Sequence, residues 1–130
     1  NICRSPMAEY FFKQLHPDIH IESAGISGLV GHSADDKAIK CMDTFNIDMR
    51  QHIAKKLNAE HIKKADLILV MSQNQQKHLE QTWPFAKGKV FRLGHWQGKN
   101  VPDPYQHDQN FFNETCLNIQ SYVSDWKSHI

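Results

Sequence analysis

The sequence predicts an α/β fold, with an open parallel sheet of about four strands and helices on both faces. Short apolar segments alternate along the chain with segments in which apolar residues recur at helical spacing. The run 66–71 is almost continuously apolar, as is typical of a parallel strand buried on both faces. With 130 residues, 40% of them hydrophobic, we expect residues 1–130 to form one domain.

The first predicted helix starts near Ser5, which suits an N-cap, with Pro6 at the first helical position. Pro17 ends this helix. Residues 19–23 alternate apolar and polar side chains, which predicts a short strand. A loop rich in glycine then leads to a predicted helix over residues 33–45.

The rest of the chain continues the alternation after a polar stretch, residues 46–64, that predicts a loop with a short helix. The later predicted elements are, in order, a strand (66–71), a helix (73–83), a strand (89–93), a loop (94–107) and a helix (109–127). No strand precedes the first helix, although the first βα turn usually holds the ligand in such sheets. We therefore expect the first strand to be absent from these 130 residues.

Charge and composition argue against several classes of partner and site. Fifteen Lys and Arg balance 14 Asp and Glu, so neither nucleic acid nor an anionic membrane is an expected partner. No apolar run approaches the roughly 20 residues of a membrane span. Three widely spaced cysteines favour a reducing cytoplasm over a disulfide framework. The nine histidines show no metal-binding spacing, so no metal or other cofactor is expected.

The segment 1–6 runs into a helix N-terminus, where unpaired N–H groups and the helix dipole favour anions. Arg4 adds a planar guanidinium that can hold two phosphate oxygens. This pattern predicts an oxyanion site. The alternative is a plain capped helix with a surface arginine.

The segment Asn-Ile-Cys-Arg-Ser-Pro-Met-Ala-Glu at residues 1–9 resembles the phosphate loop of low-molecular-weight protein-tyrosine phosphatases, whose pattern is Cys-x-Gly-Asn-x-Cys-Arg-Ser. Residues 101–105 resemble the Asp-Pro-Tyr motif that carries the general acid of this family. Further similar segments follow in family order at residues 23–25, 65–71 and 94–96. Residues 29–31 and 94–96 look most like the bacterial branch that serves exopolysaccharide systems.

This resemblance implies hydrolysis of phosphotyrosine through a phosphocysteine intermediate, without a metal. The nucleophile would lie three residues before Asn1, so the 130-residue chain by itself is expected to be inactive. Arg4 would bind the phosphoryl group, and Asp103 would protonate the leaving phenolic oxygen.

The substrate-binding residues that the resemblance implies are Asn1, Ile2, Cys3, Ser5, Leu29 and Tyr105. Asn1 would hold the loop in shape, and Ser5 would donate to the nucleophile's sulfur. Cys3 matches the second cysteine of the loop, which is not the nucleophile. It would form a reversible disulfide with the nucleophile or serve as a small buried residue. Leu29 and Tyr105 would contact the phosphotyrosine ring, with ordinary loop packing as the alternative.

Other activities on the same scaffold remain open. Arsenate reductases need further redox cysteines, whereas Cys41 and Cys116 fall on the inner faces of predicted helices. Protein-arginine phosphatases resemble this chain with threonine at the position of Ile2. For these 130 residues alone, a catalytically dead oxyanion-binding module is a further alternative.

The resemblance also suggests partners. The substrate would be a phosphotyrosine protein, and the partner that the resemblance implies is a cytoplasmic tyrosine autokinase of capsule or exopolysaccharide export. Inorganic phosphate or sulfate would fit the same loop.

Overall fold

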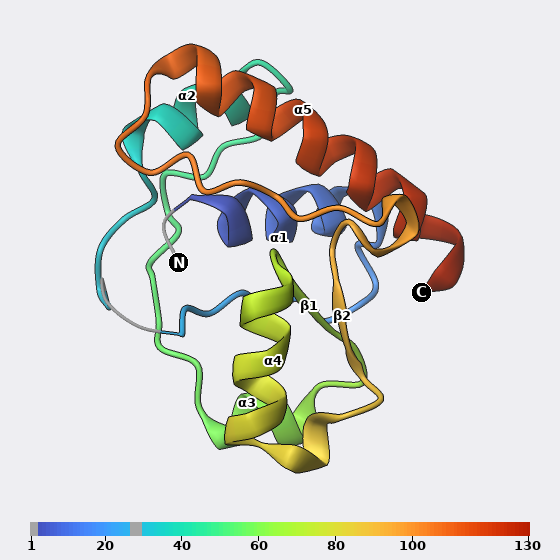
Figure 1. Cartoon of the computed structure of the whole chain (residues 1–130). Coiled ribbons are helices and arrows are strands. Elements are labelled where there is room, and N and C mark those ends of the chain that lie inside the picture. Colours follow the sequence, from blue (N-terminus) through green and yellow to red (C-terminus); the bar gives the residue numbers. More distant parts are fainter. Residues whose placement is uncertain (1–2, 27–29) are drawn as a thin grey trace.

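The computed structural model describes residues 3–26 and 30–130, in which a two-stranded parallel sheet separates two groups of helices (Figure 1). The strands are β1 (Ile68–Val70) and β2 (Val90–Arg92). Three helices lie on one side of the sheet: α1 (Arg4–Leu15), α2 (Asp36–Asp43) and α5 (Gln109–Trp126). The other side carries α3 (Ala59–Lys64) and α4 (Gln73–Thr82). Short 3₁₀ turns are η1 (Pro84–Ala86), η2 (His95–Gln97) and η3 (Lys127–His129).

The sheet divides two hydrophobic cores. Leu69 pairs with Phe91, and both side chains pack against the larger core formed with α1, α2 and α5. Val70 and Val90 belong instead to the smaller core under α3 and α4. Because successive side chains of a strand point to opposite faces, each strand contributes to both cores. The predicted α/β class, with helices on both faces of a parallel sheet, is confirmed.

Of the four predicted strands, one was expected outside these 130 residues; of the three expected within them, the described part of the chain contains two. Residues 19–23 form no strand there, although Ile21 packs against the larger core as the alternation suggests. An isolated parallel bridge joins Gly25 to Lys56 just beyond this segment. Alternation predicts a half-buried face, whereas a strand also requires a neighbouring strand for its hydrogen bonds.

The first helix begins two residues earlier than predicted, at Arg4 instead of Pro6. Cys3 occupies the N-cap position of α1, and no side chain makes a capping hydrogen bond there. The prediction of Ser5 as the N-cap is therefore wrong, since Ser5 lies inside the first turn. Pro6 is tolerated in the same turn because the first N–H groups of a helix have no intrahelical partner. The end of α1 before Pro17 is confirmed.

The second helix is shorter than the predicted span of 33–45, because it has its own capping residue. The carboxylate of Asp35 accepts a hydrogen bond from the backbone N–H of Lys37 at 2.9 Å, which defines the start of α2. The predictions for α4 and α5 are confirmed to within one residue at each end. The predicted short helix in the polar stretch is α3.

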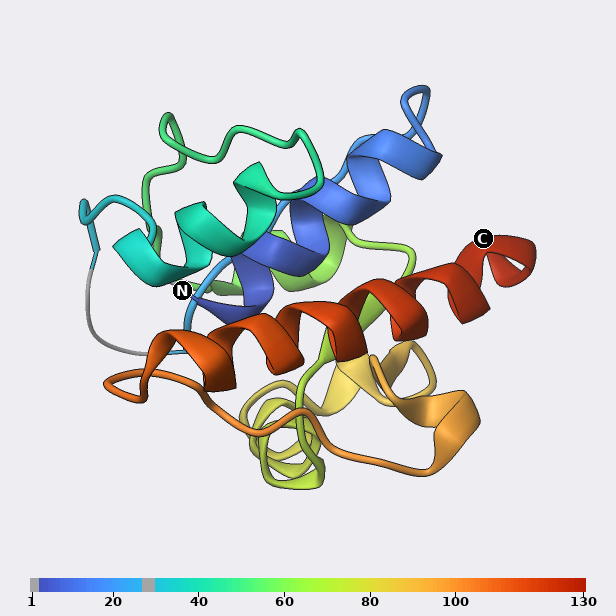
Figure 2. The same ribbon diagram turned by 90° about the horizontal axis from the view of Figure 1, so that it is seen from above.

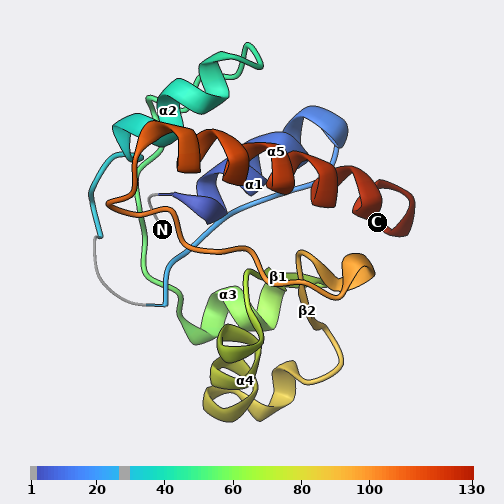
Figure 3. The same ribbon diagram turned by 45° about the horizontal axis from the view of Figure 1, so that its top comes forward.

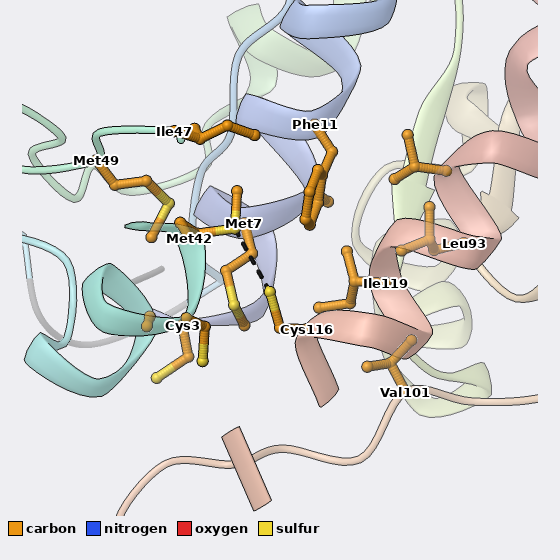
Figure 4. Packing of buried hydrophobic residues seen from close by; sticks show 14 of the residues in the cluster. Cys3, Met7, Phe11, Met42, Ile47, Met49, Leu93, Val101, Cys116 and Ile119 are labelled. Carbon is orange, nitrogen blue, oxygen red and sulfur yellow. Dashed lines mark hydrogen bonds between the residues drawn. The ribbon is translucent and has the colours of Figure 1, made fainter. Parts of the chain in front are cut away.

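The larger core is built where α1 and α2 pack beside α5 (Figure 2). Met7, Met42, Phe112 and Ile119 are among its fully buried side chains. Figure 4 shows Met7, Met42 and Ile119 within this core. Within residues 3–26 and 30–130, no helix has both the length and the apolar character needed to span a bilayer.

A tight turn after β2 begins the connection to α5. The carbonyl oxygen of Gly94 accepts a hydrogen bond from the backbone N–H of Lys99 at 3.0 Å. A Cβ atom at Gly94 would collide with the carbonyl oxygen of Lys99, so the turn requires glycine.

Candidate active site

The first half of the site is the N-terminal end of α1, where Arg4 occupies the first turn. Its side chain is 17% exposed. The Nη1 group of Arg4 donates to the carbonyl oxygen of Val101 at 2.7 Å. This bond attaches the first turn of α1 to the segment between η2 and α5, which passes the same end of α1 (Figure 3).

The second half of the site is that segment, residues 99–107, here termed the acid loop. Asp103 lies in it with 57% of its side chain exposed, and its Oδ1 is 3.9 Å from Nε of Arg4. The same Oδ1 accepts the backbone N–H of Tyr105 at 3.1 Å, which orients the carboxylate. A cation and an exposed carboxylate therefore lie side by side at the N-terminus of a helix.

Two side chains that the sequence analysis missed anchor the acid loop. Asn100 Oδ1 accepts hydrogen bonds from the backbone N–H of Gln73 at 3.1 Å and from Arg92 at 3.0 Å. At the other end, Nζ of Lys37 donates to the carbonyl oxygen of His107 at 2.6 Å. The loop is thus fixed at both ends, while Asp103 between them is exposed to solvent.

Cys3 has the properties of a buried thiol. It is 6% exposed, and burial raises its pKa to about 12, with further contributions from the charges of Asp35 and Asp103. The opposing charge of Arg4 does not reverse this shift. At neutral pH Cys3 is protonated, and because the thiolate is the nucleophilic form, it is a poor nucleophile.

The influence of Asp35 on Cys3 reveals a residue that the sequence patterns did not single out. Asp35 caps α2, so this helix brings a carboxylate close to the N-terminus of α1. Its negative charge opposes a second negative charge at Cys3.

The remaining predicted site residues are divided between the two halves or lie outside the described residues. Ser5 is in the first turn of α1, and Tyr105 is on the acid loop with 41% exposure. Asn1, Ile2 and Leu29 lie outside the described residues. Within the part of the chain that the structure describes, no three His, Cys, Asp or Glu side chains gather in a way that could hold a metal ion.

A cavity of about 620 Å³ lies elsewhere, between the outer face of α1 and residues 17–23 and 51–55. Neither Arg4 nor Asp103 lines it, and it is separate from the candidate site.

Comparison with known proteins places this geometry in a family. Residues 1–130 match the family described as low molecular weight phosphotyrosine protein phosphatase. The low molecular weight protein-tyrosine-phosphatase Ptp of Acinetobacter johnsonii is 73% identical over 130 residues, covering 100% of this chain and 92% of the relative. The probable phosphatase EpsP of Ralstonia solanacearum is 38% identical over 130 residues, covering 100% of this chain and 90% of the relative.

Comparison with solved structures leads to the same family. The structure of Vibrio vulnificus Wzb in complex with benzylphosphonate has a TM-score of 0.95 and 33% identity, covering 100% of this chain and 92% of that one. The arginine and aspartate described above therefore lie on a fold that this chain shares with that structure. This chain belongs to the low-molecular-weight protein-tyrosine phosphatase family, in the branch associated with exopolysaccharide systems.

Proposed function

We propose that the gene-encoded protein hydrolyses phosphotyrosine in proteins through a phosphocysteine intermediate, with Arg4 binding the phosphoryl group and Asp103 acting as general acid. The observation that carries this proposal is the pairing of the two side chains at one helix N-terminus, 3.9 Å apart. Family membership supports phosphotyrosine as the substrate class.

Arg4 is suited to bind the phosphoryl group because its position is fixed before substrate arrives. One N–H of its guanidinium is used by the carbonyl of Val101, and arginine has five N–H donors in a fixed fork. The remaining donors can hold two phosphoryl oxygens, while the N-terminal end of α1 adds its favourable dipole. These groups would stabilise the charge that is redistributed in the transition state.

The nucleophile of this proposal is the first cysteine of the family's loop pattern, expected three residues before Asn1. Cys3 is a weak competitor for that role, since its pKa of about 12 leaves it protonated at neutral pH. Cys3 also sits directly beside Arg4 in the sequence, whereas the family pattern separates nucleophile and arginine by five residues.

Asp103 would protonate the departing oxygen. A tyrosine leaving group has a pKa near 10, so a positioned acid should raise the rate by about 10²–10⁴-fold. The exposed carboxylate can reach both a bound ester and water. After departure of the tyrosine, the same carboxylate would take a proton from the water that attacks phosphocysteine.

The choice of phosphotyrosine over phosphoarginine has additional support. The Vibrio relative was solved in complex with benzylphosphonate, an aromatic phosphonate, which supports a substrate with an aromatic ring. We propose that Tyr105 and Leu29 contact the substrate ring and that Ile2, which lacks a hydroxyl, disfavours phosphoarginine. The natural substrate that we propose is a cytoplasmic tyrosine autokinase, by analogy with the exopolysaccharide branch.

The test is an assay of phosphotyrosine-peptide hydrolysis by three proteins: the gene-encoded protein, its Asp103→Asn variant and the 130-residue chain. We expect turnover by the first, a loss of about 10²–10⁴-fold in the second and none in the third. Phosphoarginine is the control substrate. Activity of the 130-residue chain would show that Cys3 or another described group is the nucleophile, and faster hydrolysis of phosphoarginine would overturn the substrate assignment.

A further inference from the structure

The end of the acid loop contains a residue in the left-handed backbone region. Gln106 has a φ angle of 66°. Among the non-glycine residues that the structure describes, Asn46 is the other one with a positive φ, and asparagine adopts this region more readily than most residue types. Glutamine has no such advantage, so the conformation of Gln106 costs free energy that the surrounding structure must offset. Strained backbone of this kind is concentrated at functional sites.

The conformation of Gln106 closes a four-residue turn. The backbone N–H of His107 donates to the carbonyl oxygen of Pro104 at 2.9 Å, so residues 104–107 form a β-turn with Gln106 at the third position. A positive φ at the third position but not at the second is typical of a type II turn, where glycine or asparagine is usual. The Gln106 side chain is exposed, so the turn explains this backbone conformation and burial of the side chain does not.

The last residue of the turn is held by two helices. Nζ of Lys37 on α2 donates to the carbonyl oxygen of His107 at 2.6 Å. The imidazole ring of His107 stacks on the ring of Phe111 in α5, with the centroids 4.3 Å apart and 18° between the planes. The two helices pack against each other beside this end of the loop (Figure 2). His107 therefore has a fixed position at which the turn must end.

The first half of the turn lies beside the proposed general acid. Tyr105, at the second position, donates its backbone N–H to Oδ1 of Asp103 at 3.1 Å. Pro104, at the first position, is buried. Because both ends of the turn are held, a change in the φ angle of Gln106 must be absorbed at Tyr105. The N–H group that orients the carboxylate of Asp103 would move with it.

We propose that Gln106 is a positioning residue for the general acid. Its left-handed backbone conformation holds Tyr105 in place, and the N–H of Tyr105 in turn holds the carboxylate of Asp103. This role belongs to the backbone of Gln106 and needs no contact between its side chain and the substrate. The inference rests on the proposed function of Asp103 as proton donor.

The experiment compares three variants of the gene-encoded protein: Gln106→Gly, Gln106→Asn and Gln106→Val. Glycine reaches a positive φ without a steric cost and asparagine reaches it readily, whereas β-branched valine strongly disfavours it. We expect kcat for a phosphotyrosine peptide to fall by about tenfold in Gln106→Val and to stay within about twofold of the unmodified protein in the other two. Position 106 is exposed and lies outside both hydrophobic cores, so all three variants should fold, which circular dichroism checks.

Two further measurements distinguish positioning of the acid from a general structural role. For an aryl phosphate whose leaving group has a low pKa, the loss in Gln106→Val should shrink to about twofold or less, because such a group needs little protonation. In the Asp103→Asn background, adding Gln106→Val should also cost less than about twofold, because the carboxylate that it positions is already absent.

Other results would contradict this role. Unchanged kcat in Gln106→Val would overturn the inference, and so would an equal loss in all three variants, which would assign the effect to the glutamine side chain. A further loss of about tenfold in the Asp103→Asn background would mean that Gln106 does not act through the acid. Full activity of Asp103→Asn alone would overturn the proposed function of Asp103, and the inference with it.

Discussion

Arg4 and Asp103 face each other, but they belong to regions that are built in different ways. Arg4 lies in a helical turn, with a side chain that is 17% exposed and a bond to the backbone of another segment. Asp103 lies in a loop that is anchored at its ends, with 57% exposure. The difference fits their proposed tasks: a binding group gains from a fixed, partly dry position, whereas a proton donor must also meet water.

The largest expected effect on activity comes from replacing Arg4, the less exposed of the two residues. Arg4→Lys replaces a forked donor with a single ammonium group and removes the bond to Val101. We expect kcat/KM to fall by about 10³-fold or more and the free energy of unfolding to fall by about 1 kcal/mol. Steady-state kinetics and urea denaturation measure the two effects. A loss of activity below about tenfold would contradict the role of the guanidinium fork.

On the exposed side, Asp103→Asn should separate activity from stability. We expect kcat to fall by about 10²–10⁴-fold, while stability changes by less than about 0.5 kcal/mol because the side chain is largely exposed. The loss should shrink for aryl phosphates whose leaving groups have a low pKa. An equal loss for good and poor leaving groups would show that Asp103 does not act as an acid.

The anchors of the acid loop should give a smaller effect. Lys37→Met removes the bond to the carbonyl of His107 and keeps most of the side-chain volume. Since one such bond contributes about 1 kcal/mol, we expect kcat to fall by roughly fivefold. Lys40→Met, an exposed change on the same helix, is the matched control. Equal kinetics for the two variants would mean that this anchor does not position Asp103.

The smallest effect is expected far from the site, at Glu22. Lys55 at 3.1 Å and His20 at 2.8 Å hold the pKa of Glu22 below its ordinary value of 4.5. A lowered folded-state pKa adds stability above pH 4.5, and that stability is lost as pH falls through the folded-state pKa. Because the pair is exposed, Glu22→Gln should cost less than about 1 kcal/mol at pH 7. Denaturation curves of the two proteins should converge at acidic pH.

Sequence patterns were sufficient where the physical cause is local. The apolar periodicity of α5 and the continuous apolar run at β1 are properties of neighbouring residues, so both elements were predicted. Residues 19–23 were assigned wrongly because a strand depends on a partner that alternation does not reveal. The start of α1 was also misplaced, because the turn begins without a side-chain cap.

The same distinction applies to the candidate site. Arg4 and Asp103 were found through short motifs, but the side chains that anchor the acid loop were not. Asn100 and Lys37 bind backbone groups 27 and 70 residues away along the chain. Backbone groups are present at every position, so such bonds leave no mark on the sequence of the partner segment.

The glycine turn after β2 affects which residues of this fold can change when substrate preference changes. Because a side chain at Gly94 would collide with the backbone of Lys99, the tight turn at which the chain leaves the sheet depends on glycine. The cap at Asp108 sets the point at which the chain enters α5. Residues between these two points can therefore change, and substrate preference with them, while both ends of the segment keep their positions.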